Sequence, residues 1–468
     1  MAHRKEYKAM RIQMDLNGKK VLVVGTGISG IAAAELLAAN DIRFDIFDGN
    51  EKLTEADVRA KSEVLKECPV ILGALPEDVM DNYSYVILSP GVPTDLTMVD
   101  ALRSHGAKIW GEIELAYAFS KGDVLAITGT NGKTTTTALT GEILKNYVKD
   151  VRVVGNIGIP YTSMAGTMTD ETVTVAEISS FQLETVEHFA PKVSAILNIT
   201  PDHLNRHHTM ENYIAAKERI TEGQHADQVC VLNYEDPVLR GFGEELKKKM
   251  KVLYFSSARE LAEGLYLKEE EIYTASEGTA QLVCNVNELN LLGKHNYENV
   301  MAATGIAQSY GVPLDKIREV LVRFTAVEHR IEYVTEVDGV RYYNDSKGTN
   351  PDAAIQGIRA MNRPTCLIGG GYDKQSEYDE WISAFDGKVK KLVLIGVTAK
   401  KIAETCERLG FTDYVFADSL QEAVDICHDT AVSGDAVLLS PACASWDMFD
   451  SYEQRGQMFK DMVRKLKK

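Results

Sequence analysis

A short glycine-rich segment is the part of this sequence best suited to chemistry. Gly129-Thr130-Asn131-Gly132-Lys133-Thr134 stands between an apolar run, Asp123–Thr128, and a stretch of helix-forming residues, Thr135–Lys145. A loop in this setting offers backbone N–H groups to phosphate oxygens, a lysine to the charge of the β- and γ-phosphates, and a threonine hydroxyl to Mg²⁺. The loop departs from G-x-x-x-x-G-K-[ST] because Ile127 replaces the first glycine, but its donors are the same. The segment therefore predicts binding of ATP with Mg²⁺.

A second glycine-rich turn lies near the start of the chain. Gly25-Thr26-Gly27-Ile28-Ser29-Gly30 fits G-x-G-x-x-G, follows the apolar run Lys20–Gly25 and precedes Ile31–Ala39, which favours a helix. Glycines there allow a tight turn and bring backbone N–H groups close to a diphosphate at the helix N-terminus. Asp48 ends the next apolar run, where an acid that binds a ribose or a base is expected. Alone, the turn is compatible with NAD, another dinucleotide, a UDP-sugar or no ligand.

The succession of two nucleotide-type loops narrows the function. A dehydrogenase has no need of the ATP-type loop, and an ATPase that only moves a partner has no need of the dinucleotide-type turn. An enzyme that uses ATP to join a nucleotide-linked substrate to another molecule needs both loops.

The elements that must position these loops alternate between strands and helices, which predicts parallel sheets covered by helices. We predict an α/β fold with three domains. These are a Rossmann-like domain at 1–110, a central P-loop ATPase-like parallel sheet at 111–327 and a second Rossmann-like domain at 328–468. Further runs expected as strands are Phe44–Asp48, Tyr85–Leu88, Thr172–Ile178, Val193–Ile199, Gln228–Asn233, Val340–Tyr343, Pro364–Ile368, Lys391–Ile395 and Ala436–Leu439.

The composition argues against several classes of partner. The chain has 468 residues and a net charge of −17, whereas nucleic acids and anionic membranes require a basic surface. No apolar run is long enough to cross a membrane, and Met1–Leu16 lacks the apolar segment of a secretory signal. The seven cysteines are scattered and include no C-x-x-C, so we expect reduced thiols in a cytoplasmic protein.

Several further motifs accompany the ATP-type loop. They are Gly155-Asn156-Ile157-Gly158, Glu177-Ile178-Ser179-Ser180-Phe181-Gln182-Leu183-Glu184, Asn198-Ile199-Thr200-Pro201-Asp202-His203, Ala215-Ala216-Lys217, Gly293-Lys294-His295-Asn296 and Glu328-His329-Arg330. With the loop, they resemble the Mur ligase family in the order in which they occur. The resemblance covers the chain from about residue 16 to its end.

The third predicted domain separates the members of that family. Asn344-Asp345-Ser346-Lys347-Gly348-Thr349-Asn350-Pro351 and Ser440-Pro441-Ala442-Cys443-Ala444-Ser445-Trp446-Asp447 are similar to the D-glutamate-adding member. Members that add other amino acids, and the related folate enzymes, would carry an Asp-x-Ala-His-x-Pro type of block instead. The resemblance therefore implies ATP-dependent joining of D-glutamate to UDP-N-acetylmuramoyl-L-alanine through an acyl phosphate, by a monomer.

The resemblance also implies roles for individual residues. Catalytic roles would fall on Lys133, His203, Lys217 and Lys347. ATP would contact Gly129, Thr130, Asn131, Gly132, Lys133, Thr134, Thr135, Asn296, Arg330 and Asp345. The UDP-linked substrate would contact Ile28, Ser29, Asp48, Gly91, Asn156 and His203. D-Glutamate would contact Thr349, Lys374, Ser445, Trp446 and Tyr452. Mg²⁺ would be held by Thr134, Glu177, His203 and Lys217, the last as a carbamate.

At one position the residue pattern and the resemblance give different expectations, and at another this sequence departs from the family. By pattern alone, Lys217 would lie on a solvated helix face within Tyr213–Ile220, and only the resemblance implies a carbamate. Gly49-Asn50 stands where other members have a Thr-Arg pair, so contacts to the uracil and diphosphate on that side differ.

Three other functions compete with this interpretation. A ligase for L-alanine, L-lysine or folate glutamate is disfavoured by the block Asn344–Pro351. A P-loop ATPase that acts on a partner would not need His203 and Lys217, and a nicotinamide enzyme would depend on Gly25–Gly30 alone.

Overall fold

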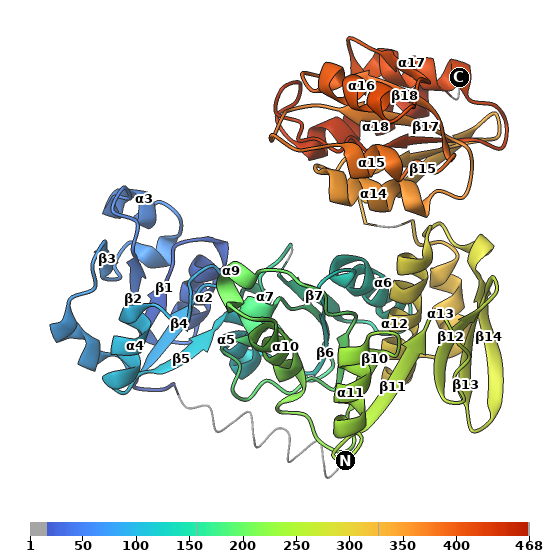
Figure 1. The fold of residues 1–468 in the computed structure, drawn as a ribbon. Coiled ribbons are helices and arrows are strands. Elements are labelled where there is room, and N and C mark those ends of the chain that lie inside the picture. Colours follow the sequence, from blue (N-terminus) through green and yellow to red (C-terminus); the bar gives the residue numbers. More distant parts are fainter. Residues whose placement is uncertain (1–15, 157, 326, 467–468) are drawn as a thin grey trace. The chain divides into compact units, whose positions relative to one another are not determined.

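The computed structural model describes residues 16–156, 158–325 and 327–466 (Figure 1). The chain forms two compact units. The first takes in the chain up to residue 268 together with 273–283 and 298–317, and the second takes in 269–272, 284–297 and 318–468. The prediction that Met1–Leu16 holds no secretory signal concerns residues that, apart from Leu16, lie outside the described part of the chain.

A five-stranded parallel sheet opens the first unit. Alternate residues of its central strand enter two different apolar cores, Val21 and Val23 on one face, Leu22 and Val24 on the other. Apolar cover on both faces is typical of a parallel sheet. The strands are, in spatial order, β3 (Val70–Leu72), β2 (Arg43–Asp48), β1 (Lys20–Val24), β4 (Tyr85–Leu88) and β5 (Lys108–Gly111). The helices and 3₁₀ turns are α2 (Ile28–Ala39), α3 (Glu55–Arg59), η1 (Glu63–Leu65), η2 (Glu77–Asn82) and α4 (Thr97–Ser104).

A nine-stranded sheet follows along the chain. Its spatial order is β14 (Thr279–Asn285), β13 (Glu271–Ser276), β12 (Gly264–Lys268), β11 (Lys251–Ser256), β10 (Val229–Asn233), β9 (Val193–Ile196), β6 (Asp123–Thr128), β8 (Val173–Glu177) and β7 (Val151–Gly155). The neighbours from β7 to β12 pair in parallel. The helices and 3₁₀ turns of this part of the sequence are α5 (Glu112–Phe119), α6 (Lys133–Lys145), α7 (Tyr161–Ala165), α8 (Ser180–Leu183), α9 (Leu204–His207), α10 (Met210–Glu218), η3 (Arg219–Thr221), α11 (Pro237–Leu246), η4 (Val286–Glu288), α12 (Lys294–Tyr310) and α13 (Leu314–Leu321).

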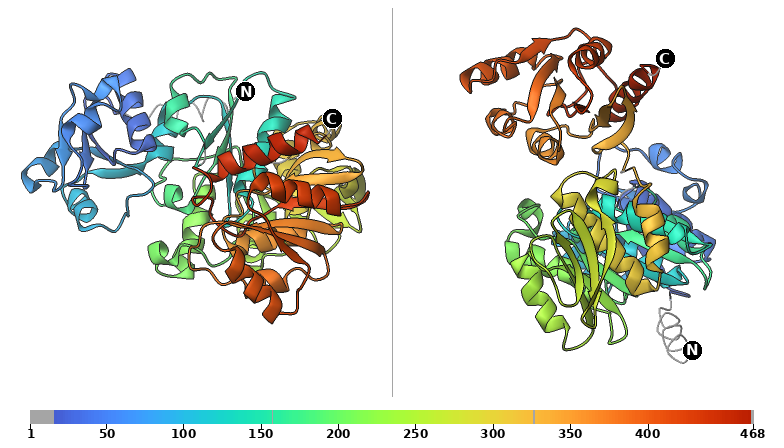
Figure 2. Two further views of the ribbon diagram at one scale, coloured as in Figure 1. Left: turned by 90° about the horizontal axis from the view of Figure 1, so that it is seen from above. Right: turned by 90° about the vertical axis from the view of Figure 1, so that its right-hand side faces the viewer.

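The second unit is built on a six-stranded sheet (Figure 2). Cys366 and Ile368 face one apolar core, and Leu367 between them faces the other. The strands are, in spatial order, β15 (Glu332–Val337), β16 (Val340–Asn344), β20 (Ala436–Leu439), β17 (Thr365–Gly370), β18 (Val389–Ile395) and β19 (Tyr414–Phe416). Only the β15–β16 pair is antiparallel among the neighbours in this sheet. The helices are α14 (Pro351–Ala360), α15 (Asp379–Ser383), α16 (Ala399–Arg408), α17 (Leu420–Thr430) and α18 (Tyr452–Lys465).

These sheets confirm the predicted α/β fold and its three sheet-based parts. All seven cysteines are buried and free, which confirms the prediction of reduced core thiols. Within the described residues, no helix combines the length and the apolar character needed to cross a membrane. The sequence prediction does not include strands β3, β5, β7, β11–β15 and β19. In β14 the reason is that its first four residues are exposed, so it lacks a continuous buried apolar run.

One buried carboxylate anchors the helix between the first two sheets. Glu114 on α5 has a fully buried side chain. Its oxygens accept hydrogen bonds from the backbone N–H groups of Glu187 (2.9 Å), His188 (2.8 Å) and Phe189 (3.1 Å). Burial of a carboxylate is tolerated only where donors replace its water shell, as they do here. The loop before β9 is thereby held on α5.

Replacement of Glu114 should therefore weaken the fold. We expect Glu114→Ala to lower the free energy of unfolding by about 2–4 kcal/mol, because three N–H groups lose their acceptor in a buried setting. Urea denaturation followed by circular dichroism measures the change. Glu142→Ala is the matched control, since that side chain is 48% exposed and pairs only with Lys145 on the same helix. Equal urea midpoints for the two variants would contradict the anchoring role.

Candidate functional site

The glycine-rich loop after β6 has the geometry of an anion site. Gly132 caps α6 with φ of +84° and provides no side chain to the helix, so the first N–H groups of the helix remain open to a ligand. Helix N-termini of this kind attract phosphate through those N–H groups and the helix dipole. A Cβ at Gly132 would lie 2.2 Å from Oδ1 of Asn299, so only glycine fits. Thr134 and Thr135 lie in the first turn of this helix.

The loop is held in place without a ligand. Asn131 and Asn198 exchange two hydrogen bonds, from Asn131 N to Asn198 Oδ1 (2.8 Å) and from Asn198 Nδ2 to Asn131 O (3.1 Å). The Thr130 hydroxyl lies 3.0 Å from the Tyr213 hydroxyl and accepts the Thr200 N–H at 3.0 Å. The loop is therefore tied to the segment after β9, and the N–H groups of Thr130 and Asn131 are already bonded to Asn198.

Two lysines converge on this loop. Lys133 donates from Nζ to the carbonyls of Gly129 (2.9 Å) and Thr130 (2.8 Å). Lys217 on α10 donates from Nζ to the same Gly129 carbonyl at 2.8 Å. Lys217 is only 2% exposed, so the expectation from residue pattern that it lies on a solvated face is wrong. Burial, and then the charge of Lys133, lower the pKa of Lys217 to about 7.

Glu177 ends the strand next to β6. It pairs in register with Ile127, is buried, and accepts a hydrogen bond from Asn156 Nδ2 at 3.0 Å on Oε1. The Asn156 backbone N–H also donates to the Glu177 carbonyl at 2.8 Å. The structure thus brings together two residues to which different ligands were assigned, Asn156 for the UDP-linked substrate and Glu177 for the metal. Ile157, from the same motif as Asn156, lies outside the described residues.

The predicted metal ligands fit Mg²⁺ in part. The Glu177 carboxylate and the Thr134 hydroxyl are the hard oxygen donors that Mg²⁺ prefers. In the described part of the chain, no three His, Cys, Asp or Glu side chains form a cluster that could hold a metal ion. The predicted set contains only two such residues, Glu177 and His203. As an ammonium Lys217 would repel a cation, whereas as a carbamate it would add an anionic oxygen ligand.

His203 lies in a strained turn. It has φ of +52° and precedes α9, its ring centroid lies 4.9 Å from that of Phe181, and its Nε2 lies 3.4 Å from Asp202. Non-glycine residues rarely adopt this left-handed conformation, and such strain gathers at functional sites. The predicted strand Val193–Ile199 ends earlier, at Ile196, because the following residues turn to bind the phosphate loop. His203 therefore does not lie directly at the end of a strand.

The first glycine-rich turn forms a second anion-type site. Gly25 has φ of +101°, and a Cβ at Gly30 would lie 2.0 Å from the Gly25 carbonyl oxygen, which explains both glycines. Ile28 is 78% exposed at the start of α2. Ser29 follows it in the same turn of helix. Gly91 is exposed after β4, the parallel neighbour of β1.

Asp48 is occupied with holding this turn. Its Oδ2 accepts the Thr26 N–H (2.9 Å) and hydroxyl (2.6 Å), and its Oδ1 accepts the Asn50 N–H (3.0 Å). Partial burial raises the pKa of the Asp48 carboxyl, but these hydrogen bonds outweigh burial and leave the pKa below its usual value. Lys61 donates to the Thr26 carbonyl at 2.8 Å, which brings a cation beside the turn that the sequence prediction missed. The part of Asp48 in ligand binding stays a prediction.

In the second unit, loops from adjacent parallel strands begin side by side. Asn344 at the end of β16 pairs in register with Leu439 at the end of β20, which in turn pairs with Ile368 on β17. Parallel sheets place their ligands at this edge. The residues predicted to bind D-glutamate lie on the loops after these strands and at the start of α18: Thr349, Lys374, Ser445, Trp446 and Tyr452.

Two aromatic side chains among them each lie near a lysine. Lys374 Nζ lies 5.1 Å from the Trp446 ring centroid, and Lys347 Nζ lies 5.4 Å from that of Tyr452. Trp446 is 63% exposed, and its ring centroid lies 5.5 Å from that of Tyr372. Two cation–aromatic pairs thus lie on the loops at this edge of the sheet, and their part in binding an amino acid stays a prediction.

A buried arginine joins the two main loops. Arg455 on α18 donates from Nε to the Ser346 hydroxyl (2.9 Å) and from Nη2 to the Ser346 carbonyl (2.8 Å). It also donates to the carbonyls of Cys443 (3.2 Å) and Ala444 (3.3 Å). Burial lowers the pKa of Arg455 to about 10. The sequence prediction missed this residue, because an arginine on an amphipathic helix carries no signal of burial.

The predicted ATP residues of the second unit differ in accessibility. Arg330 is exposed, whereas Asn296 is buried and donates to the Leu292 carbonyl at 2.8 Å. Asp345 is also buried, and burial raises the pKa of its carboxyl to about 7. Its oxygens accept the Ile331 N–H (3.2 Å) and the Ser440 hydroxyl (2.7 Å). Asp345 therefore holds two loops together, and its contact with a ribose stays a prediction.

Three family models match most of the chain. Residues 19–111 match the "Mur ligase MurD-like, N-terminal domain", residues 127–307 the "Mur ligase middle domain", and residues 329–443 the "Mur ligase, glutamate ligase domain".

Full-length relatives agree with these matches. A protein of Lachnoclostridium phytofermentans named "UDP-N-acetylmuramoylalanine--D-glutamate ligase" is 56% identical over 97% of this chain and 100% of its own length. A protein of the same name from Clostridioides difficile is 47% identical, again over 97% of this chain and 100% of its own.

Solved structures share the fold at low identity. UDP-N-acetylmuramate-alanine ligase MurC of Thermotoga maritima has a TM-score of 0.57 at 20% identity, over 96% of this chain and 99% of its own. MurF ligase of the same organism, solved in complex with ADP, has a TM-score of 0.55 at 15% identity, over 97% of each chain.

The lowered pKa of Lys217 has a measurable consequence for stability. Its pKa is about 7 in the folded chain and 10.5 for an unperturbed lysine, so between these pH values the unfolded chain binds more protons. Stability from this group therefore rises with pH across that window. We expect the melting temperature of the wild type to rise relative to that of Lys217→Met as pH increases from 7 to 10, in buffer free of carbon dioxide. Parallel pH profiles of the two proteins would contradict the lowered pKa.

Proposed function

This chain belongs to the Mur ligase family, and we propose that it uses ATP to join D-glutamate to UDP-N-acetylmuramoyl-L-alanine, a step of peptidoglycan precursor synthesis. The observation that carries the proposal is the 56% identity, over 97% of this chain, to a protein named for that reaction. The glycine loop with Lys133 and Lys217 supports it independently, because an ATP-driven ligation requires a site for the transferred phosphate.

The proposed division of labour follows the three predicted domains. Residues 1–110 would bind the UDP-linked substrate through the turn at Gly25–Gly30, with Ile28, Ser29 and Gly91 beside it. Residues 111–327 would bind ATP at Gly129–Thr135, and residues 328–468 would bind D-glutamate. The exposed Ile28 and the pairing of Lys374 with Trp446 support the two outer assignments.

The first chemical step brings two anions together. The L-alanyl carboxylate oxygen attacks the γ-phosphorus of ATP, the bond to the β,γ-bridging oxygen breaks, and ADP leaves as an acyl phosphate forms. Lys133 and the N–H groups of α6 would hold the phosphates, and Lys347 would offset the charge that develops on the transferred group. Mg²⁺, held by Thr134, Glu177, His203 and carbamylated Lys217, would neutralise phosphate charge when bound.

The second step forms the amide. The amino group of D-glutamate, once neutral, attacks the acyl carbon, and the tetrahedral intermediate expels inorganic phosphate. Thr349, Lys374, Ser445, Trp446 and Tyr452 would hold the amino acid. Arg455 would act through these loops, because its hydrogen bonds tie the segment of Ser346 to that of Cys443 and Ala444.

The state of Lys217 follows from its burial. An amine reacts with carbon dioxide only when it is neutral, and a pKa of about 7 leaves much of Lys217 neutral at physiological pH. The ammonium first loses one proton, and the neutral nitrogen then forms a bond to the carbon of CO₂ and loses a second, so that a buried cation becomes an anion. We propose that this carbamate is the form that works with Mg²⁺.

We propose further that the enzyme works as a monomer in the cytoplasm, where ATP is available. The net charge of −17 supports a protein that engages neither nucleic acid nor anionic membrane.

Phosphate release tests the reaction and its specificity together. The protein is supplied with ATP, Mg²⁺ and UDP-N-acetylmuramoyl-L-alanine, and with D-glutamate, L-glutamate, L-lysine or L-alanine in parallel. We expect release with D-glutamate only. Lys133→Ala should reduce the rate by at least about 100-fold because it removes a phosphate ligand. The matched control Lys145→Ala, on the exposed face of the same helix, should retain activity. Phosphate release with a different amino acid would keep the ligase assignment and change its substrate. No release with any of the four amino acids would reject the ligase assignment.

Carbon-13 NMR tests the carbamate directly. We expect the protein in ¹³C-bicarbonate to show a carbamate resonance that is absent from Lys217→Met. The resonance should gain intensity as pH rises through about 7, since the neutral amine becomes more abundant. An identical spectrum from wild type and variant would reject carbamylation of Lys217, while leaving the ligase assignment to the phosphate assay.

A further inference from the structure

The chain enters the six-stranded sheet through a strained segment. Just before β15, His329 has φ of +65° and Ile331 has φ of +46°. A β-branched residue in this left-handed region is a strong outlier, and such conformations persist only where the surroundings enforce them. Between these two residues lies Arg330, an exposed cation. The contacts that enforce the conformation therefore determine where Arg330 is held.

The backbone of this segment is bonded to the loop that carries Lys347. The Lys347 N–H donates to the His329 carbonyl at 3.1 Å, and the Ile331 N–H donates to Asp345 Oδ1 at 3.2 Å. The residues on both sides of Arg330 are thus tied to the residues on either side of Ser346. Arg330 and Lys347 are held on a common framework although they are distant in the sequence.

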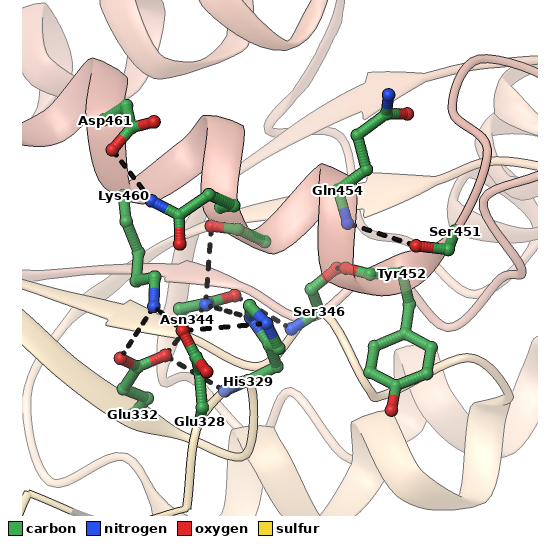
Figure 3. Close-up of polar contacts among 12 residues, drawn as sticks. Glu328, His329, Glu332, Asn344, Ser346, Ser451, Tyr452, Gln454, Lys460 and Asp461 are labelled. Carbon is green, nitrogen blue, oxygen red and sulfur yellow. Dashed lines mark hydrogen bonds and ion pairs between the residues drawn. The ribbon is translucent and has the colours of Figure 1, made fainter.

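The side chain of Asn344 links the same two segments (Figure 3). Its Oδ1 accepts the Ser346 N–H at 3.1 Å, which fixes the orientation of the amide. Its Nδ2 must therefore be the group that faces His329 Nδ1 at 2.8 Å and Glu332 Oε2 at 3.0 Å. Asn344 is completely buried. One amide group thus binds the loop of Lys347 with its oxygen and the segment of Arg330 with its nitrogen.

The protonation of His329 agrees with this arrangement. Burial lowers the pKa of the imidazole, with the charges of Glu328 and Lys460 acting in opposite directions. A neutral ring with its proton on Nε2 leaves Nδ1 as an acceptor for Asn344. The Glu332 carboxylate accepts the His329 backbone N–H at 2.9 Å and also the Asn344 Nδ2 group. It therefore restrains both partners of the contact between Asn344 and His329.

Helix α18 covers the contact from the other side (Figure 3). Lys460 is 5% exposed and bridges Glu328 and Glu332, the latter at 3.2 Å. Gly456 lies against His329, where a Cβ would approach Nδ1 to 2.2 Å. The segment before β15 is therefore enclosed by the loop after β16 and by α18, and it has little freedom to relax.

We infer that Asn344 is a positioning residue that holds Arg330 and Lys347 in one fixed arrangement, so that the second unit presents both cations to ATP together. The inference rests on the proposed function for the roles of Arg330 and Lys347 toward ATP. Loss of the Asn344 amide would free His329 and its neighbours to leave the left-handed conformation, and Arg330 would shift with them. A displacement of about 1 Å is enough to cost about 100-fold in rate.

A double-mutant cycle in the full chain tests the inference. The variants are Asn344→Ala, Arg330→Lys and the double variant, and the readouts are kcat/KM for ATP and the Kd of ATP without the other substrates. We expect Asn344→Ala to lower kcat/KM for ATP by about 10- to 100-fold, and to change KM for the UDP-linked substrate less than about 3-fold. In the Arg330→Lys background, the same change should cost at least about 3-fold less than it does in the wild type, and the remaining loss acts through Lys347. Asn362→Ala, exposed in the same unit, is the matched control.

Independent, multiplying effects of the two substitutions would overturn the inference, and so would an Arg330→Lys variant that binds and uses ATP like the wild type. Failure of the proposed function is separate, because the wild type alone reveals it when D-glutamate triggers no phosphate release. If Asn344→Ala does not fold, Asn344→Ser serves instead, since its shorter polar side chain cannot join Ser346 to His329 and it adds no charge beside Glu332. A change confined to kcat/KM and Kd for ATP supports the inference. An equal increase in KM for every substrate overturns it.

Discussion

The Gly129 carbonyl accepts hydrogen bonds from two lysines, Lys133 and Lys217, and the first unit is organised around this contact. Burial, and then the nearby charge of Lys133, lower the pKa of Lys217 to about 7. Lys133 is the first residue of α6, whose N-terminus has no side-chain cap and where phosphate charge is expected. The early end of β9 follows from the hydrogen bonds of Asn198 to this loop, and the buried Lys217 on α10 donates to the Gly129 carbonyl.

In the second unit, the candidate site also lies at the carboxyl edge of parallel strands, but buried side chains hold its loops in place. Its candidate site consists of cationic and aromatic side chains, whereas the site of the first unit consists of a glycine-rich loop. The loops that carry these side chains must therefore be held in place. Arg455 on α18 holds two of these loops, with its donors directed at Ser346, Cys443 and Ala444. Asn344 joins the loop of Ser346 to the segment of His329 through its side-chain amide. Neither residue faces the surface, and both act by removing freedom from loops that would otherwise fluctuate.

Prediction from sequence succeeded where a local pattern is enough. The strands Tyr85–Leu88, Asp123–Thr128 and Ala436–Leu439 have the predicted bounds, because continuous apolar runs between turn residues define buried parallel strands. It failed at β14, whose first four residues are exposed, and at the end of β9, where Asn198 binds Asn131. Contacts between residues far apart in sequence decided both of these places.

The sequence by itself determined which chemistry is available. The glycine loops, the motifs in their order and the block Asn344–Pro351 indicated a Mur-type ligase and its amino acid, because such signals are local and depend on residue type. Only the tertiary structure decided the state of those residues. It lowered the pKa of Lys217 by burial, raised that of Asp345, and enclosed Arg455 and Asn344 where no pattern marks them. Burial and charge at a given atom come from all the chain folded around it, and residue order does not contain them.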